Sequence, residues 1–452
     1  FENIIDILSS DFYLNELNIS NFKKILDLKI ILHKNLTVFI GENGAGKTSL
    51  LRAIQKNLSW FSAFILKENT NGERIVDPEI NNQAKENGEV AYVNCSFRIG
   101  VENRIDGQLI REPQGITTDL RTEVMEYRKF GKNIRELLAY QKTNLPLFMF
   151  YDIERFKVSE NRKNLSSQEN VFYQFDGYEK SSKSRVALES LIDWLAKLLK
   201  ISNEVIENSE KLKIESQIDS LLKAGADNKD NPLNELYEDL VSLIKLYPND
   251  ETKNASQKAV KSLEKIFRKI YPDLIRIQLI NNDDGEDKIG LQLKDEIIFL
   301  HQFSDGQRVL FGLLGDITRR LMLLNPVADD PLLGNGVVLI DEVELHLHPS
   351  WQQKIILILR ESFPNIQFIV TTHSPHVLST VDKKEIRIIK NNLVEQPNFQ
   401  TKGVTSATIL EQIMDSYSVP QVEESQWITE YLSLIQIGEF SLAILELARS
   451  QS

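Results

Sequence analysis

The chain has 452 residues, of which 42% are hydrophobic and 26% charged, and this composition is typical of folded globular proteins and excludes global disorder. The net charge of −12 argues against a broad basic surface that coats nucleic acid, although a local basic groove stays open. The longest apolar runs are far shorter than the roughly 20 residues of a membrane span, and no secretory signal precedes them. We therefore expect a cytoplasmic protein that does not bind a membrane. The single cysteine, Cys95, excludes an intramolecular disulfide and a cysteine cluster for zinc. Because the chain begins at Phe1 without methionine, we expect that some N-terminal residues are missing.

The N-terminal part of the chain leads through predicted strands into a glycine-rich loop. Apolar patterns predict strands at 12–19, 25–32 and 36–40. The next eight residues, GENGAGKT at 41–48, open a helix and match the phosphate-binding pattern GxxxxGK[ST] in its strand-loop-helix setting. Glycines allow successive N–H groups to point into one concavity at the positive end of that helix. The loop is therefore predicted to bind ATP through Asn43, Gly44, Ala45, Gly46, Lys47, Thr48 and Ser49.

Two residues of this loop have further predicted roles, and the turn before it offers two more candidates. Lys47 can reach the β- and γ-phosphates, and Thr48 supplies a hydroxyl to Mg²⁺. In the turn at 21–24, Phe22 or Lys23 could lie against adenine or phosphate. A strand-connecting turn with a packed aromatic ring explains that pattern about as well.

The next segment completes a first lobe. Strands are predicted at 90–99 and 145–151, with a charged helical segment around 119–140 between them. Asp152–Arg155 follow the second strand at its carboxyl end, where sites gather in α/β sheets, so Arg155 is a candidate site residue.

An inserted helical subdomain is predicted at 184–270. Leucines and isoleucines recur there at helical spacing among charged residues. Polar turns at 225–232 and 247–250 interrupt the pattern, which favours short helices over a long coiled-coil arm.

A second possible anion site follows strand-like segments at 274–279 and 289–300. The sequence QFSDGQ at 302–307 opens an amphipathic helix predicted at 308–324. A loop with serine and glycine at a helix N-terminus can bind an anion. An ordinary N-cap formed by Ser304 or Asp305 would explain the same residues.

Two later segments end buried strands in polar side chains. In VVLIDE at 337–342, side chains alternate in direction, so Asp341 can bind Mg²⁺ while Glu342 addresses the attacking water. In QFIVTTHS at 367–374, a strand ends beside His373, which can hydrogen-bond a γ-phosphate oxygen. Both segments are typical of a nucleoside triphosphatase.

GENGAGKT, FSDGQ, VVLIDE and TTHS, in this order, resemble the four motifs of ABC-type ATPases of the RecF and SMC group. The resemblance covers about 1–60 and 296–390. It implies an α/β fold, namely an ABC-type P-loop ATPase head with a mixed sheet, an antiparallel β subdomain and an inserted helical subdomain. It also implies that two heads sandwich two ATP molecules. The implied roles are Glu342 as base, His373 as γ-phosphate sensor, Asp341 and Thr48 as Mg²⁺ ligands, and Ser304, Asp305, Gly306 and Gln307 as contacts to the partner's ATP.

A narrower resemblance comes from DEVELHLHPSWQ at 341–352, which is similar to the overcoming-lysogenization-defect ATPases and to the PtuA family of Septu and retron antiphage defence systems. The pattern at 407–414 and the short helices expected after it also fit that group. The resemblance implies self-association as a homodimer or a higher even-numbered oligomer. It further implies a separate HNH nuclease of PtuB type and, in a retron, a reverse transcriptase with its DNA product, so that DNA is reached through the complex. No Toprim-type acidic cluster is visible, which separates the chain from the overcoming-lysogenization-defect nucleases themselves.

These observations predict four parts, 1–183 with the P-loop, 184–270 as the helical insertion, 271–403 with the other three motifs, and a helical extension at 404–452. Several alternatives stay open. The chain could be an SMC- or RecF-like repair ATPase, a transporter motor or a ring-forming remodeller. Glu344 is a substitute base if Glu342 is not the base. Zinc is a minor alternative, with His346, His348, His373 and His376 as its ligands.

Overall fold

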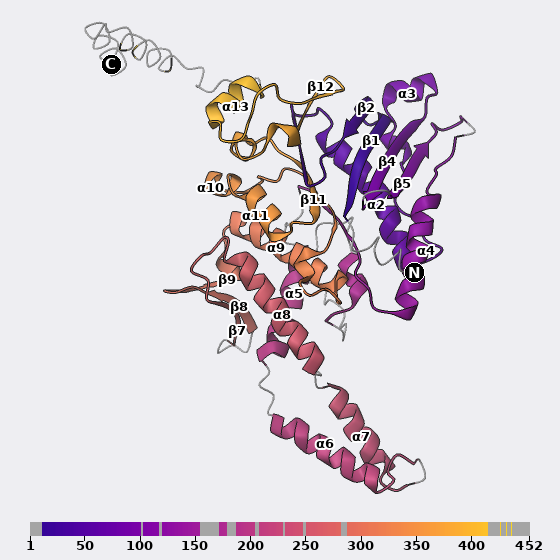
Figure 1. Cartoon of the computed structure of the whole chain (residues 1–452), viewed down its shortest axis with the longest axis vertical. Helices are drawn as coiled ribbons and strands as arrows, with labels where there is room; N and C mark the ends of the chain where they lie inside the picture. The colour runs from indigo at the N-terminus through magenta and orange to yellow at the C-terminus, as the bar shows by residue number, and fades with distance from the viewer. Residues whose placement is uncertain are drawn as a thin grey trace.

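The computed structural model describes residues 11–100, 103–116, 120–153, 171–178, 187–203, 208–228, 231–246, 250–281 and 287–414, together with positions 425, 431 and 435. These residues form three β-sheets and the helices around them (Figure 1). The candidate Arg155 and most of the predicted extension at 404–452 lie outside the described residues. Within the described ranges, no helix combines the length and the apolar character needed to cross a membrane.

A six-stranded mixed sheet carries the P-loop, the VVLIDE strand and the TTHS strand. Its order is β13 (Leu393–Glu395), β12 (Ile386–Lys390), β3 (Leu36–Gly41), β11 (Ile366–Thr371), β10 (Gly336–Ile340) and β6 (Leu147–Tyr151), and only the β12–β13 pairing is antiparallel. Parallel strands covered on both faces are apolar throughout, and β6, β10 and β11 are buried along their whole length. Since β3, β10 and β11 are parallel neighbours, the residues that follow them meet at one sheet edge.

A second, antiparallel sheet lies on the other side of α2 (Lys47–Leu66). Its order is β2 (Ile25–Ile31), β1 (Phe12–Phe22), β4 (Ala91–Ile99) and β5 (Asn103–Arg111). Phe61 of α2 places its ring centroid 5.5 Å from Phe12, 5.0 Å from Phe97 and 4.1 Å from Tyr127. α4 (Met125–Tyr140) packs against α2 as well. This aromatic core fixes the helix that begins at the P-loop, and the predicted antiparallel β subdomain is confirmed.

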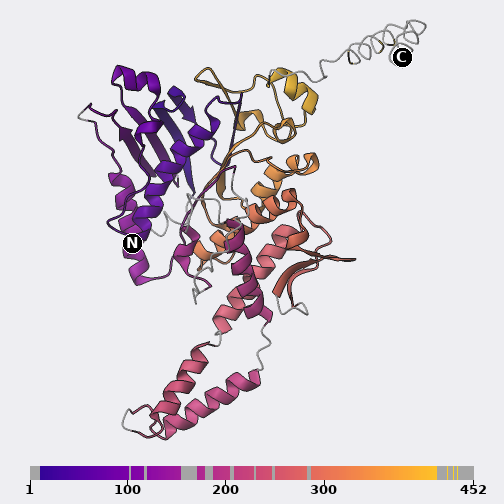
Figure 2. The same ribbon diagram turned by 180° about the vertical axis from the view of Figure 1, so that it is seen from behind.

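The predicted insertion divides into two structural parts. α5 (Ala187–Asn203) and α8 (Asp250–Phe267) pack against each other and against α9 (Asp305–Leu324). α6 (Asn208–Lys223) and α7 (Asn234–Leu246) form a hairpin that projects from the body, as Figure 1 and Figure 2 both show. The hairpin helices have 16 and 13 residues.

The remaining elements connect these layers. A three-stranded antiparallel sheet precedes α9, with the order β7 (Arg276–Asn281), β8 (Asp287–Gln292) and β9 (Ile297–Phe299). The short helix α3 (Asn82–Asn87) precedes β4 of the antiparallel sheet, and further short helices join the later strands of the mixed sheet and follow it: α10 (Pro349–Gln352), α11 (Ile355–Ser362), α12 (Pro375–Leu378) and α13 (Ser406–Gln412). Single 3₁₀ turns are η1 (Asp77–Glu79), η2 (Gln174–Tyr178), η4 (Leu300–Gln302), η5 (Pro331–Leu333) and η6 (Lys383–Glu385).

Candidate nucleotide-binding site

The loop between β3 and α2 has the backbone of a phosphate cradle. Gly44 and Gly46 have φ angles of 82° and 99°, which side chains with a Cβ rarely adopt. A Cβ atom at Gly46 would also lie 3.3 Å from the Ile25 side chain. Gly46 is the N-cap of α2, and no side chain in the described part of the chain caps that helix. Its first N–H groups therefore suit an anion, and the loop fits the phosphates of a nucleotide.

The ammonium group of Lys47 lies over the same loop. Its Nζ donates hydrogen bonds of 2.9 Å to the backbone carbonyls of Gly41 and Glu42. Burial lowers the pKa of Lys47 below its ordinary value of 10.5, while the carboxylates of Asp341, Glu342 and Glu344 partly oppose that shift. The loop thus holds a cation whose desolvation would be relieved by an anionic phosphate.

Lys24, which the sequence analysis did not single out, also approaches the loop. A Cβ atom at Gly44 would lie only 2.9 Å from Lys24 Nζ. The two earlier candidates in this turn are placed differently. Phe22 is fully buried in the core, and Lys23 Nζ lies 3.8 Å from the Glu79 carboxylate. Lys23 has a φ of 53°, and this left-handed turn directs the following residue toward the P-loop.

Asp341 and Thr48 meet although 293 positions separate them in the sequence. The Thr48 hydroxyl donates a hydrogen bond of 2.8 Å to Asp341 Oδ2. The Thr371 hydroxyl donates a second bond, of 2.6 Å, to Asp341 Oδ1. Asp341 and Thr371 are buried. A carboxylate and a hydroxyl at the mouth of a phosphate loop are the oxygen ligands that Mg²⁺ prefers, so the donor set fits the predicted metal. Thr371 is a second residue whose role the sequence did not reveal.

Glu342 and His373 occupy the turns that follow β10 and β11. Glu342 has a φ of 48°, and its backbone N–H donates to Thr371 Oγ1 at 2.7 Å. His373 follows Thr372, whose backbone N–H donates to the carbonyl of Phe39 in β3 at 3.1 Å. Both side chains are half-buried. The sheet edge therefore brings the two predicted catalytic residues to the ends of the neighbouring strands β10 and β11, and β11 pairs with the P-loop strand β3.

The FSDGQ segment begins α9 and forms the N-cap that the sequence allowed. Ser304 Oγ accepts from Gln307 N at 3.4 Å, and Gln307 Oε1 accepts from Ser304 N at 2.9 Å, which is a reciprocal capping box. Ser304 and Asp305 are exposed, whereas Gly306 is buried. A Cβ atom at Gly306 would lie 2.6 Å from the backbone carbonyl oxygen of His346. The segment thus presents two exposed residues and contacts the turn after β10 through its glycine.

The four histidines of the zinc alternative are not gathered into a metal site. His348 Nδ1 pairs with Ser350 Oγ at 2.9 Å, and His376 Nδ1 pairs with Ser406 Oγ at 2.9 Å. Over the described ranges, no group of three or more His, Cys, Asp or Glu side chains is placed to hold a metal ion.

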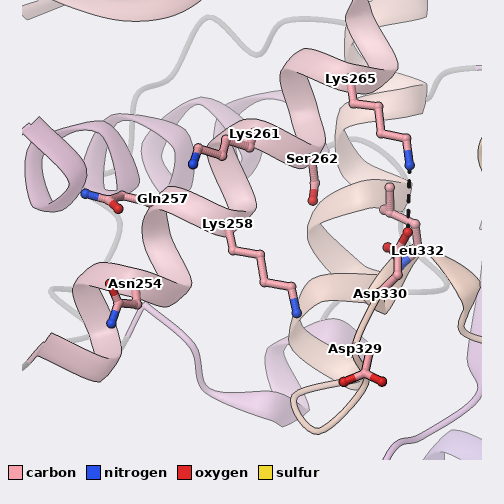
Figure 3. A pocket seen from close by; sticks show the side chains of 9 residues that line it. All are labelled: Asn254, Gln257, Lys258, Lys261, Ser262, Lys265, Asp329, Asp330 and Leu332. Carbon is pink, nitrogen blue, oxygen red and sulfur yellow. Dashed lines mark hydrogen bonds and ion pairs between the residues drawn. The ribbon is translucent and has the colours of Figure 1, made fainter.

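A cavity of about 410 Å³ lies apart from these motifs, between α8 and residues 329–332 (Figure 3). Lysines dominate one wall, but two of them already bind groups of the opposite wall. Lys265 Nζ lies 3.8 Å from Asp330 Oδ2, and Lys258 Nζ donates to the carbonyl of Ala328 at 3.3 Å. These contacts fasten α8 to the loop that leads into β10.

Comparison with known proteins gives a family match and several relatives. The AAA ATPase domain family matches residues 13–378, which include all four motifs. The probable ATPase of retron Vc95 from Vibrio cholerae serotype O1 biovar El Tor is 30% identical over 443 residues, 94% of this chain and 82% of that protein. The probable ATPase of retron Ec83 from Escherichia coli is 29% identical over 449 residues, 93% of this chain and 79% of that protein. Septu protein PtuA from Bacillus mycoides (strain KBAB4) is 31% identical over 186 residues, 39% of this chain and 24% of that protein. Among solved structures, the chain is similar to the Smc head domain from Pyrococcus furiosus, which was solved with an extended coiled coil and bound to the C-terminal domain of ScpA. The match covers 89% of this chain and 100% of the Smc chain, with a TM-score of 0.43 and 17% identity.

Proposed function

Because the chain belongs to the AAA ATPase domain family and has the motifs and fold of an ABC-type ATPase that resembles PtuA, we propose that it is the ATP-binding and hydrolysing subunit of an antiphage defence complex. In this proposal the ATPase dimerises and regulates a separate nuclease, and the complex is cytoplasmic. The observation that carries the chemistry is the 2.8 Å bond between the Thr48 hydroxyl and the Asp341 carboxylate. It joins the P-loop to the end of β10 in a chain similar to two retron ATPases over most of its length.

The chain's own residues divide the work of hydrolysis. ATP with Mg²⁺ supplies the phosphoanhydride that is cleaved and the metal charge that offsets the phosphates. The N–H groups of the P-loop and Lys47 would hold the phosphate chain, and Thr48 with Asp341 would hold the metal. Glu342 orients a water molecule and takes its proton, while His373 donates a hydrogen bond to the γ-phosphate.

Replacement of Glu342 tests this assignment. Glu342→Gln should bind ATP as the unaltered protein does, because the phosphate loop is unchanged. Its turnover should fall about 100-fold or more, the usual contribution of a general base. Glu361→Gln on the surface of α11 is the matched control, and EDTA should stop turnover in both proteins. Full turnover of Glu342→Gln would remove Glu342 from the base role.

Self-association is proposed through the exposed start of α9. Ser304 and Asp305 face outward at the N-terminus of a 20-residue helix, where a partner protomer's bound nucleotide can be contacted. Asp305→Arg, placed in the Glu342→Gln background, should return an ATP-dependent dimer to a monomer in light scattering while each chain still binds ATP. Asp329→Arg is the matched control, since Asp329 is exposed and outside the motifs. A dimer that survives Asp305→Arg contradicts the sandwich.

The proposed partners are an HNH nuclease of PtuB type and, in a retron, a reverse transcriptase with its DNA product. This part rests on the similarity to the retron ATPases and to Septu protein PtuA. Purification from the native operon followed by mass spectrometry tests it. Recovery with an HNH protein supports the proposal. Recovery of the ATPase alone, beside a gene for a permease, would favour the transporter alternative.

A further inference from the structure

Glu344 belongs to the turn after β10 that carries Glu342, and its side chain contacts the turn after β11 that carries His373. Its Oε1 accepts a hydrogen bond from the backbone N–H of His373 at 2.6 Å, and its Oε2 accepts one from the Thr372 hydroxyl at 2.7 Å. We propose that Glu344 is a positioning residue, whose carboxylate fixes the His373 turn against the Glu342 turn. This inference rests on the proposed function for its catalytic consequence, although the contact itself does not require nucleotide.

The geometry separates this role from that of a substitute base. Each oxygen of the Glu344 carboxylate already accepts from a protein donor at the short distances typical of charge-assisted bonds. To act as the base, Glu344 would have to take a proton from the attacking water. The protonated carboxyl group would then lose or weaken at least one of these two bonds. Glu344 is half-buried, so solvent does not readily replace a lost partner.

The carboxylate is also one member of a closed ring of hydrogen bonds. Thr372 Oγ1 accepts from Ser374 N at 3.0 Å, and Ser374 Oγ donates to Gln352 Oε1 at 2.6 Å. Gln352 Nε2 then donates to the carbonyl of Leu347 at 2.8 Å, which returns the ring to the turn that contains Glu344.

His373 stands between two residues of this ring, Thr372 and Ser374. The backbone from which its imidazole extends is therefore held on both sides. Leu347 N donates to the carbonyl of Glu344 at 2.9 Å, and Leu345 N donates to the carbonyl of Glu342 at 2.9 Å. These backbone bonds continue the connection from the ring to Glu342.

Substitutions distinguish positioning from base chemistry. Glu344→Ala removes both acceptors and should lower kcat about 10- to 100-fold, the usual effect of losing a residue that orients a ligand or catalytic group. Glu344→Gln can still accept from His373 N and can donate to Thr372 Oγ1, so its kcat should stay within about threefold of the parent. Thr372→Val should lower kcat about tenfold, the rate equivalent of one bond to a charged group, and Thr372→Ser should recover most of that loss. The Kd for a slowly hydrolysed ATP analogue should change by no more than about twofold in the two Thr372 variants, since they remove no charge and their side chain does not touch the P-loop.

A base role predicts the opposite pattern. Glu344→Gln would then lose as much turnover as Glu344→Ala, and Thr372→Val would retain the parent rate. Either result overturns the proposal. Glu361→Gln, a glutamate substitution on the exposed face of α11, is the control that should leave turnover and analogue binding unchanged.

A second readout does not depend on ATPase activity. Hydrogen exchange of a peptide that spans 371–374, measured on the full chain without nucleotide, should be faster in Glu344→Ala than in the parent and close to the parent in Glu344→Gln. Unchanged exchange in Glu344→Ala would overturn the positioning role even if the protein hydrolyses ATP. If the unaltered chain shows no turnover, the proposed function fails, whereas faster exchange in Glu344→Ala would still establish that Glu344 holds this turn.

Discussion

Thr371→Val is the change that most directly tests how Asp341, the carboxylate that we propose binds Mg²⁺, is held. Thr371 is fully buried, and its hydroxyl donates to Asp341 Oδ1 at 2.6 Å while it accepts from Glu342 N at 2.7 Å. Valine has the same shape without the hydroxyl. Loss of the bond to the charged group costs about 1.5–3 kcal/mol, and the N–H left without an acceptor costs roughly another 1–3 kcal/mol. The buried methyl group that valine adds returns about 1 kcal/mol. We therefore expect a net loss of about 1.5–5 kcal/mol in the free energy of unfolding.

Urea unfolding in buffer without nucleotide or Mg²⁺ measures this loss. Thr371→Ser is the matched control, because it keeps the hydroxyl and removes only a methyl group, at a cost of about 1 kcal/mol. The difference between the two variants isolates the hydroxyl. Valine should also weaken Mg²⁺-dependent ATP binding about 10- to 100-fold, since Asp341 loses the group that orients it. Equal unfolding midpoints for the valine and serine variants would refute this account of Thr371.

Two further changes test contacts made outside the P-loop. Gly306→Ala should lower the free energy of unfolding by about 1–3 kcal/mol, because its Cβ would lie 2.6 Å from the His346 carbonyl oxygen, despite the better helix propensity of alanine. A higher Tm in thermal unfolding would contradict that reasoning. Asp316→Asn should cost about 3–5 kcal/mol, because it leaves the buried Arg320 guanidinium without the carboxylate that now accepts from it at 2.7 Å. Burial by itself raises the pKa of Asp316, but Arg320 and Arg319 together lower it by a larger amount. The net pKa of Asp316 therefore lies below its ordinary value of 3.8. The stability that this pair contributes is therefore present above that value and is lost as pH falls through the lower folded pKa. Unfolding midpoints measured between pH 3 and 7 should fall less steeply with acid in Asp316→Asn than in the parent, and a steeper fall would contradict the ion pair.

The parts of the site that could be predicted are those in which motif and strand are adjacent in the sequence. GENGAGKT lies directly between β3 and α2, and Asp341 follows directly on the buried strand β10. Their meeting point could be predicted because the carboxyl ends of parallel strands share one edge of a sheet. The capping box at Ser304 is local as well, and the sequence allowed it without distinguishing it from an anion site.

The contacts that could not be predicted depend on how side chains turn between distant segments. Glu342 and His346 have φ angles of 48° and 64°, in the left-handed region, and between them the Glu344 carboxylate meets the His373 backbone. Motif spacing contains no information about these angles. For the same reason the sequence offered Phe22 or Lys23 as candidates for a nucleotide contact without deciding between that role and a packed turn, whereas in the structure Lys24 is the residue of this turn whose Nζ lies beside Gly44.

Tyr151 shows how the helical layer is connected to the chemistry at the sheet edge. Its backbone carbonyl accepts from Asp341 N at 2.8 Å, and its hydroxyl donates to Asp316 Oδ2 on α9 at 2.8 Å. One residue at the end of β6 therefore bonds both to Asp341, the proposed Mg²⁺ ligand, and to the helix that begins with FSDGQ. The contact at α9 is buried and charged, so the helix cannot shift there without exposing or breaking an ion pair. The exposed start of α9, where we propose that a second protomer binds, thus belongs to a helix that is hydrogen-bonded to Asp341 through Tyr151, and at Gly306 it lies against His346 in the turn after β10.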